Sequence, residues 1–258
     1  MFADGVYEVI PAYQGKPFRL PQHLVRLCDG LAQVGIPSPY TDKQWQHLID
    51  QLIDKNGGGH LSIYIQVTRG CNQQRQHVYD SDVQPTVLLM TLPLTTDQQT
   101  ITCSKVTLLA DSRWQHCDIK STALLANIML SNQASALGFD EAILHRDHVV
   151  TEGASTNVFM VKDGRIYTPE KSHLILGGIT RDLIIELCHR AHLEIHQQRI
   201  HIDQLLTADE VWISSSSREI SPVIQIDDKI IGHGGVGPMS KYVFTLFQQF
   251  KRDLITNS

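Results

Sequence analysis

The sequence predicts a two-domain α/β (α+β) protein, and two observations lead to this fold class. Strands with alternating apolar residues and helices with apolar residues three and four positions apart are interspersed along both halves of the 258-residue chain. A short polar segment, "TTDQQT", separates the halves. We therefore expect a small N-terminal domain at residues 1–93, a linker at 94–99 and a larger C-terminal domain at 100–258, on either side of a central cleft.

The N-terminal half is expected to form a hairpin, two helices and two strands. "GVYEVIPAYQGKPFRL" alternates around a glycine turn, which is typical of a β-hairpin. A first helix starts at Pro21 and ends at Gly35. A second helix begins at Thr41, whose side chain can form a capping box with Gln44. "LSIYIQVTRG" and "TVLLMTLPL" are then expected to be strands, the second broken at Pro93.

The C-terminal half mixes the same elements. We expect a strand at "SKVTLLAD", a helix from about Ser121 to Leu137, a strand at "DEAILHR", a turn at "DH" and a loop at "TEGASTN". "VFMVKDGRIYTP" predicts a hairpin that turns at Asp163 and Gly164. A helix follows "GGIT", and "EVWISSSSREISPVIQID" is expected to be a strand, a hydroxyl-rich loop and another strand. The last predicted helix is "KYVFTLFQQFKRDL".

Composition narrows the class of protein. The 22 Lys and Arg against 27 Asp and Glu give a net charge of −5, which argues against nucleic acid as a partner. No apolar run approaches the roughly 20 residues of a membrane span, and the N-terminus lacks a signal-peptide profile. The five scattered cysteines without a C-x-x-C motif favour reduced thiols. We therefore expect a cytoplasmic protein that contacts neither nucleic acid nor membrane.

Four features suggest a site for chemistry. Lys120 stands where a polar segment meets an amphipathic run, and Glu152 lies in the Gly- and Ser-rich "VTEGASTN". "GGIT" opens a helix, whose free N–H groups suit an anion, and "SSSS" at Ser214–Ser217 could hold a phosphate. Each feature alone has an ordinary structural explanation. Together, a lysine amine, a carboxylate and two phosphate-suited loops are what pyridoxal phosphate requires.

Nine blocks then carry a resemblance to a known family. They are "FADGVYEV", "HLVRL", "YIQVTRG", "RWQHCDIKS", "NQASALGFDEAILHRD", "VTEGASTNVF", "DGRIYTP", "LILGGITRD" and "SREISPVI". On these blocks the chain resembles the class IV (fold-type IV) pyridoxal-phosphate-dependent aminotransferases through nearly its whole length. The resemblance implies a two-domain fold with pyridoxal 5′-phosphate as the cofactor in the cleft between the domains.

The resemblance also implies roles for individual residues. Lys120 would form a Schiff base with the cofactor and move the proton between the substrate α-carbon and the cofactor C4′, and Glu152 would pair with the pyridine nitrogen. Ser155 and Leu176 would line the faces of the cofactor, and Arg113 would lie near its hydroxyl. The phosphate would be bound by the following residues: Arg26, Ile179, Thr180, Ser215 and Ser216.

Three kinds of enzyme in the family compete: D-amino acid transaminases, L-branched-chain transaminases and aminodeoxychorismate lyases. The D-enzymes carry a carboxylate trap, which here would be Tyr7 of "DGVYEV" with Arg75 and His77 of "RQH". In the family that arginine and histidine come from the neighbouring subunit, so the trap implies a homodimer. The favoured reaction is D-alanine and 2-oxoglutarate to pyruvate and D-glutamate, by a ping-pong mechanism through Lys120.

The match has two departures. Relatives usually carry further residues, which form strands of the small domain, before the block that here is "MFADGVYEV". Pro11 stands where the D-transaminases often have a lysine, so the range of substrates is expected to differ. An inactive dimer that still binds the cofactor is therefore a further alternative.

Two other kinds of site were weighed and set aside. Cys188, His189, His192 and His196 have short spacings that could suit zinc, but "HLEIH" is expected to leave the helix for a strand and so to separate them. We expect no metal. His116 beside Cys117 could suggest thiol catalysis, but neighbours in sequence rarely have the required geometry.

Overall fold

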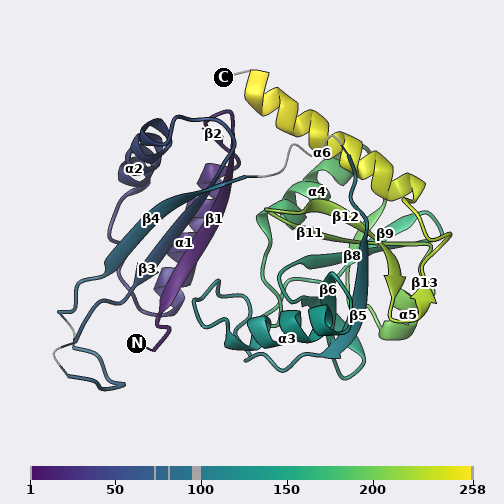
Figure 1. Ribbon diagram of the computed structural model, residues 1–258, viewed down its shortest axis with the longest axis horizontal. Coiled ribbons are helices and arrows are strands. Elements are labelled where there is room, and N and C mark those ends of the chain that lie inside the picture. The colour runs from purple at the N-terminus through teal and green to yellow at the C-terminus, as the bar shows by residue number, and fades with distance from the viewer. Residues whose placement is uncertain (1, 73, 81, 95–99, 257–258) are drawn as a thin grey trace. The chain divides into compact units, whose positions relative to one another are not determined.

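The computed structural model describes residues 2–72, 74–80, 82–94 and 100–256, and it divides into two compact units (Figure 1). One unit comprises Met1–Thr95 with Ile119–Leu124, and the other comprises Thr96–Asp118 with Leu125–Ser258. Residues 95–99 of the predicted linker lie outside the described residues, so that boundary stays a prediction. The mixture of helices and strands in both units confirms the predicted α/β (α+β) class.

The first unit is a four-stranded antiparallel sheet with two helices. The strand order is β2-β1-β3-β4. Its strands are β1 Gly5–Tyr13, β2 Lys16–Pro17, β3 Leu61–Thr68 and β4 Thr86–Pro93. Its helices are α1 Leu20–Gln33 and α2 Asp42–Lys55.

Local signals in the sequence predicted this unit well. β1 and β2 pair as the expected hairpin, and Gly35 has the positive φ (67°) that ends a helix after α1. Thr41 caps α2 in the predicted capping box: it accepts from the backbone N–H of Gln44, whose side chain accepts from the N–H of Thr41. β4 ends at Pro93, because proline has no N–H to donate to a strand ladder.

The core of the first unit lies between the sheet and its helices. Alternate residues of β1 and β3, such as Val6, Ile10, Ile63 and Ile65, are fully buried against both helices. Trp45 of α2 is the largest fully buried side chain of this cluster. Because strand side chains alternate, the neighbours of Val6 in β1 include a residue on the opposite face of the sheet, Tyr7.

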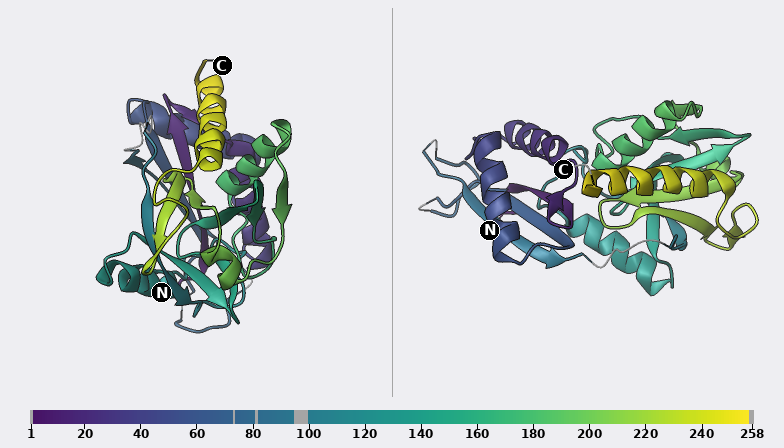
Figure 2. Two further views of the ribbon diagram at one scale, coloured as in Figure 1. Left: turned by 90° about the vertical axis from the view of Figure 1, so that its right-hand side faces the viewer. Right: turned by 90° about the horizontal axis from the view of Figure 1, so that it is seen from above.

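The second unit contains a nine-stranded mixed sheet, seen from two further sides in Figure 2. The path of the sheet is β10-β9-β8-β11-β12-β5-β6-β7, with β13 paired to β12. The strands are β5 Ser104–Ala110, β6 Glu141–Arg146, β7 Val149–Gly153, β8 Asn157–Lys162, β9 Arg165–Thr168, β10 Ile195–Gln197, β11 Glu210–Ser215, β12 Glu219–Ile226 and β13 Lys229–Ile230. The helices are α3 Leu125–Ala136, α4 Ile179–Arg190, α5 Ile202–Leu206 and α6 Pro238–Thr256.

Two predictions in this unit were wrong in their bounds. The helix expected from about Ser121 begins at Leu125, because Ser121 instead pairs with Val6 of β1 and the N–H of Thr122 donates to the carbonyl of Gly5. The loop expected at "TEGASTN" begins later, because Thr151 to Gly153 belong to β7, which pairs with β6. The short elements α5 and β13 were not among the expected elements.

Other predictions for this unit are confirmed. Asp163 and Gly164 both have positive φ (49° and 74°), as a two-residue hairpin turn between β8 and β9 requires. α4 ends at Arg190 and β10 begins at Ile195, so "HLEIH" does leave the helix for a strand. Within the described part of the chain, no helix has the length and apolar character needed to cross a membrane.

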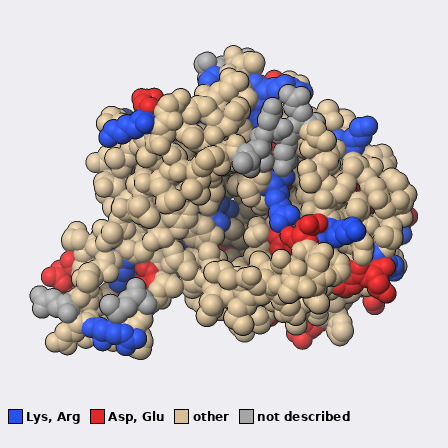
Figure 3. Space-filling view, viewed as in Figure 1, with Lys and Arg blue, Asp and Glu red and all other residues tan. Residues whose placement is uncertain are grey.

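The charged side chains are mixed in sign. On the face shown in Figure 3, Lys and Arg lie among Asp and Glu and do not merge into one broad basic surface. This distribution agrees with the small negative net charge of −5. It gives no electrostatic footprint for a polyanion on that face.

Candidate active site

Lys120 lies beside Tyr7 in the first unit. The Nζ atom of Lys120 is 4.2 Å from the centre of the Tyr7 ring, a cation–π contact. The backbone N–H of Tyr7 donates to the carbonyl of Lys120 at 2.9 Å. Tyr7 of β1 therefore contacts both the backbone and the side-chain amine of Lys120. Tyr7 in turn stacks on Tyr64 of β3, with ring centres 5.7 Å apart. The amine is therefore positioned by β1 rather than by a helix.

On the opposite face of β1, Glu8 binds Arg26 and His23 of α1. Arg26 donates from Nε to Oε1 at 2.7 Å and from Nη2 to Oε2 at 2.8 Å, and His23 Nδ1 lies 2.7 Å from Oε2. Glu8 and His23 are both buried. This fork holds the guanidinium of Arg26, the residue expected to bind phosphate, in one orientation.

Burial and charge act against each other in this cluster. Burial would raise the pKa of Glu8, but the Arg26 guanidinium and the His23 ring together hold that pKa well below its usual range. Burial lowers the pKa of His23, although the Glu8 carboxylate acts in the other direction. Glu8 and His23 were not among the residues predicted for the site. The sequence does carry a signal for Glu8, because this carboxylate falls on the same face of the strand as the apolar residues Val6 and Ile10.

Arg75 and His77 meet at one aromatic side chain. The Cζ atom of Arg75 lies 4.7 Å from the centre of the Phe2 ring, and the His77 ring centre is 5.0 Å from it. Both side chains are exposed. The structure thus brings two of the three predicted trap residues to a common contact within the first unit.

The segment that carries these two residues is tethered by Arg69. Its guanidinium pairs with Asp4, from Nε to Oδ2 at 2.6 Å and from Nη2 to Oδ1 at 3.0 Å. It also donates to the carbonyls of Val34 and Gly35 at the end of α1. The ring of Tyr79 lies 3.7 Å from its Cζ atom. Arg69 therefore joins the start of β1, the end of α1 and the segment after β3.

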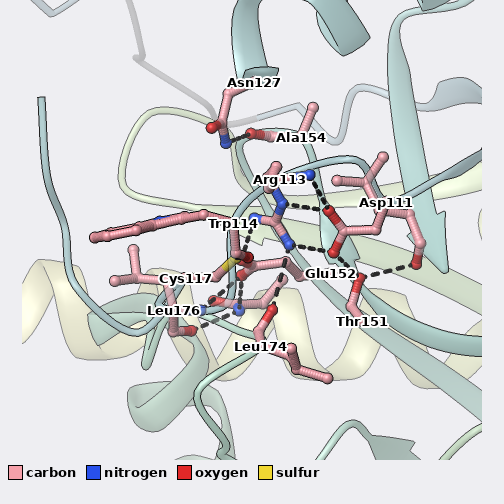
Figure 4. A network of polar contacts seen from close by, with 12 residues as sticks. Asp111, Arg113, Trp114, Cys117, Asn127, Thr151, Glu152, Ala154, Leu174 and Leu176 are labelled. Carbon is pink, nitrogen blue, oxygen red and sulfur yellow. Dashed lines mark hydrogen bonds and ion pairs between the residues drawn. The ribbon is translucent and has the colours of Figure 1, made fainter. Parts of the chain in front are cut away.

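Glu152 of β7 is the centre of a buried polar network in the second unit (Figure 4). Its Oε1 accepts from Nη1 of Arg113 at 2.6 Å. Its Oε2 accepts from the backbone N–H of Leu176 at 3.0 Å and from Nδ2 of Asn157 at 3.2 Å. Arg113 also pairs with Asp111, from both Nε and Nη2 at 2.9 Å.

The two carboxyls beside Arg113 have opposite pKa shifts. Burial raises the pKa of Glu152 to about 7, although the Arg113 guanidinium and the Leu176 N–H act in the other direction. Burial also raises the pKa of Asp111, but its hydrogen bonds to Arg113 outweigh that effect and leave it below its usual range. Glu152 is thus a carboxyl poised to change charge near neutral pH, a property common at functional sites.

The chain around Glu152 is tightly packed. Ser155 donates to Oε2 of Glu141 at 2.7 Å, and Nδ2 of Asn157 also donates to the carbonyl of Leu176 at 2.9 Å. A Cβ atom added to Gly178 would clash with Oδ1 of Asn157, so only glycine fits there. Leu176, expected to line the cofactor, contacts Glu152 through its backbone N–H.

Two places in the second unit suit an anion. Gly178 precedes the first turn of α4 and has no side chain to cap it, and Ile179 and Thr180 supply N–H groups at that helix start. In the turn between β11 and β12, Ser215 Oγ lies 3.3 Å from Ser217 Oγ and accepts from the N–H of Arg218 at 3.1 Å. Ser216 lies in the same turn.

The surroundings of Cys117 argue against the thiol alternative. The Sγ atom of buried Cys117 donates to the carbonyl of Trp114 at 3.2 Å, and burial raises the pKa of the thiol to about 11. It is therefore protonated and a poor nucleophile at neutral pH. Over residues 2–72, 74–80, 82–94 and 100–256, no three or more His, Cys, Asp or Glu side chains are grouped to hold a metal ion.

Comparisons with known proteins show which family the chain is similar to. The family model for amino-transferase class IV matches residues 5–226. D-alanine aminotransferase of Bacillus licheniformis is 40% identical over 248 residues, covering 96% of this chain and 87% of that relative. D-alanine aminotransferase of Listeria monocytogenes is 35% identical over 258 residues, covering 98% and 88%. The solved branched-chain amino acid aminotransferase of Escherichia coli is 25% identical with a TM-score of 0.88, covering 96% of this chain and 86% of that one.

Proposed function

The chain belongs to the class IV aminotransferases, and we propose that it uses pyridoxal 5′-phosphate to transfer amino groups from D-amino acids to 2-oxo acids. The relatives named D-alanine aminotransferase, at 40% and 35% identity over nearly the whole chain, support this substrate class. The observation that carries the proposal is the buried Glu152, whose pKa is raised to about 7 beside Arg113. Such a carboxyl group suits a ligand that donates a hydrogen bond to it.

The residues of the second unit fit the cofactor. Oε1 of Glu152 accepts one hydrogen bond from Arg113 and has a second lone pair, which suits the N–H of a protonated pyridine. The start of α4, with Ile179 and Thr180, and the turn with Ser215 and Ser216 offer N–H and hydroxyl donors to a phosphate. Ser155 lies three residues after Glu152 in sequence, and the backbone N–H of Leu176 donates to Glu152, so both would lie near the cofactor ring.

In the first unit, two cations fit roles toward the same cofactor. Arg26 would hold the phosphate, and Glu8 would fix the direction of its guanidinium through the fork on α1. Lys120 would provide the amine that holds the cofactor covalently, and its contact with the Tyr7 ring would fix its direction.

The proposed mechanism divides the work between Glu152 and Lys120. When bound, pyridoxal phosphate supplies an electron-withdrawing ring that makes the amino acid's α-proton removable. Glu152, as a carboxylate, would keep a proton on the ring nitrogen, and Arg113 would keep Glu152 ionised for that task. The Lys120 amine would take the proton from the α-carbon and return it at C4′. The same two groups would serve both half-reactions, and the first 2-oxo acid would leave before the second binds, which gives ping-pong kinetics.

Tyr7, Arg75 and His77 would form the trap for the substrate carboxylate. Arg75 and His77 already share the Phe2 contact, so they would act as one unit. We propose that they act across a homodimer, as in the family. The edge strand β4 supports a second copy, because its apolar residues are largely exposed: Leu88 46%, Met90 37% and Leu92 47%. The preferred pair would be D-alanine and 2-oxoglutarate.

The test is the visible absorbance of the purified protein during separate additions of D-alanine and L-alanine. We expect a cofactor band that only D-alanine converts to the aminated form of the cofactor. Conversion by L-amino acids such as L-leucine would instead favour a branched-chain aminotransferase. The structural similarity to the Escherichia coli enzyme is the reason to test this alternative. Pyruvate release from aminodeoxychorismate without an amino acceptor would favour the lyase. A band that no amino donor changes would favour an inactive cofactor-binding dimer.

A further inference from the structure

The turn that carries Ser215 and Ser216 ends in an unusual residue, Glu219. Glu219 has φ 55°, in the left-handed region where glycine is the usual residue, and only 1% of its surface is exposed. A buried carboxylate at a strained backbone position persists only where its surroundings hold it there. Interactions with other residues must therefore compensate for both the burial of the Glu219 carboxylate and its backbone strain.

Those partners come from the C-terminal helix α6. Lys251 Nζ lies 2.9 Å from Oε1 of Glu219, and Nε2 of Gln248 donates to Oε2. Lys251 and Gln248 are each 8% exposed and are three residues apart, so they share one face of α6. α6 thus binds the carboxylate of Glu219, at the end of the turn, through a buried ion pair and a hydrogen bond.

The same helix is fixed at its other end to the same hairpin. Glu210, the first residue of β11, accepts the backbone N–H groups of Met239 and Ser240 at 2.8 Å each. A carboxylate at a helix N-terminus is favourable because it complements the helix dipole. The rise of the helix from Ser240 to Lys251 is about 16 Å, which matches the roughly 17 Å that β11 spans from Glu210 to Ser215.

α6 therefore lies along the β11–β12 hairpin, fixed at both ends of its length, as its position beside these strands in Figure 1 illustrates. Next to Glu219 in the chain, Arg218 donates to the carbonyl of Asp140 at 2.9 Å. The two residues that follow the serines thus fix the end of the turn to different elements, Arg218 to Asp140 and Glu219 to α6. A shift of either anchor would move the Ser215 and Ser217 hydroxyls, which have only short side chains with which to compensate.

We infer that the Glu219–Lys251 pair is a positioning device for phosphate: by holding the serine turn to α6, it sets the protein's affinity for the phosphate group of its cofactor. This inference rests on the proposed function for the nature of the cofactor. It assigns to α6 a role in cofactor affinity through residues that touch neither the cofactor nor the substrate. Lys251 and Glu219 act through Ser215 and Ser216.

The test compares the binding of pyridoxal phosphate and of pyridoxal, which lacks the phosphate, by absorbance titration of the full-length protein. We expect Lys251→Met to raise the Kd for pyridoxal phosphate about tenfold and to change the Kd for pyridoxal by less than about twofold. Lys241→Met is the matched control, because Lys241 is an exposed lysine of the same helix. Lys251→Arg keeps the charge and is expected to retain most of the affinity.

Glu219→Gly separates the ion pair from the backbone shape. Glycine suits the left-handed position, so a role in turn conformation alone predicts unchanged or tighter binding. The positioning role predicts a loss similar to that of Lys251→Met. Gln248→Ala, a milder change, replaces Lys251→Met if the latter does not fold. Equal weakening of both ligands, or no change in either, would overturn the inference.

Binding of pyridoxal phosphate by the unaltered protein distinguishes a failure of the proposed function from a failure of the inference about the Glu219–Lys251 pair. If it binds pyridoxal phosphate, the variants test the inference alone. If it shows no absorbance change with pyridoxal phosphate, the proposed function fails. Calorimetric titration with inorganic phosphate then tests the turn directly: weaker phosphate binding by Lys251→Met than by Lys241→Met supports the role of the pair, and equal binding refutes it.

Discussion

Arg113 donates to Glu152 at 2.6 Å while it pairs with Asp111 on its other side, so one buried guanidinium serves two carboxyls. The pKa of one carboxyl is raised and that of the other is lowered. The difference arises because Asp111 accepts two side-chain hydrogen bonds and a backbone N–H from Arg113 and lies beside Arg146. Glu152 accepts only one hydrogen bond from Arg113, and the effect of its burial prevails. A pair of carboxyls with divergent pKa values is a common arrangement for assigning different tasks to similar groups.

Replacing Arg113 by Met should raise the pKa of Glu152 still further, because the nearby positive charge that opposes burial is lost. Glu152 would then be protonated at neutral pH and could not hold a proton on the cofactor ring. We expect kcat at pH 7 to fall by on the order of 100-fold. The acid limb of the kcat–pH profile should move to higher pH. Arg165→Met, which removes an exposed pair with Glu194, is the control and should leave the profile in place.

Glu152→Gln should change the pH dependence of stability in the cofactor-free protein. The folded-state pKa of Glu152 is raised from 4.5 to about 7, so the folded state binds the proton more tightly than the unfolded state. The contribution of Glu152 to stability is therefore greatest below pH 4.5 and declines as pH rises toward 7, by roughly 3 kcal/mol. Urea unfolding at pH 5 and pH 8 measures this. A decline of the same size in Glu152→Gln would show that another group causes it.

Glu8→Gln should destabilise the first unit, because it leaves Arg26 and His23 without their buried carboxylate. Breaking a buried pair costs about 3–5 kcal/mol in the free energy of unfolding. The pKa of Glu8 is lowered in the folded state, so its contribution is present above pH 4.5 and is lost as pH falls below that value. The difference between the variant and the unaltered protein should therefore shrink below pH 4.5. Glu170→Gln, at an exposed position, should show no such difference at any pH.

Arg69→Met should weaken substrate binding without weakening cofactor binding. The change releases Asp4, the end of α1 and Tyr79 together, and so loosens the segment that carries Arg75 and His77. We expect KM for D-alanine to rise about tenfold, while the Kd for pyridoxal phosphate stays the same. Arg69→Lys keeps the charge but lacks the fork, and should give an intermediate KM. A parallel loss of cofactor affinity would indicate general damage to the unit.

Features whose partners are close in sequence could be predicted. The capping box of Thr41 and Gln44 and the turn at Asp163 and Gly164 each depend on neighbouring residues, and the structure has both. Lys120 and Glu152 were found because a lysine at a junction and a carboxylate in a glycine-rich segment recur in a family pattern. Their roles toward a cofactor stay predictions.

Features whose partners are distant in sequence could not be predicted. The helix near Lys120 begins late because residues 121 and 122 pair with β1, more than a hundred residues earlier. The buried ion pair of Glu219 depends on Lys251, 32 residues later, and nothing in the local pattern of "SSSSRE" indicates such a pair. Such pairs follow from the packing of one element on another, which periodicity does not encode.

The assignment of Ile119–Leu124 to the first unit means that the backbone passes from one unit to the other more than once. A gene fragment that ends at residue 94 would consequently lack Lys120 and the backbone partners of Gly5 and Tyr7. Neither unit can be transplanted as a single continuous segment. Recombination between relatives would have to exchange two separate pieces of sequence together, which ties the inheritance of the lysine to that of the N-terminal strand.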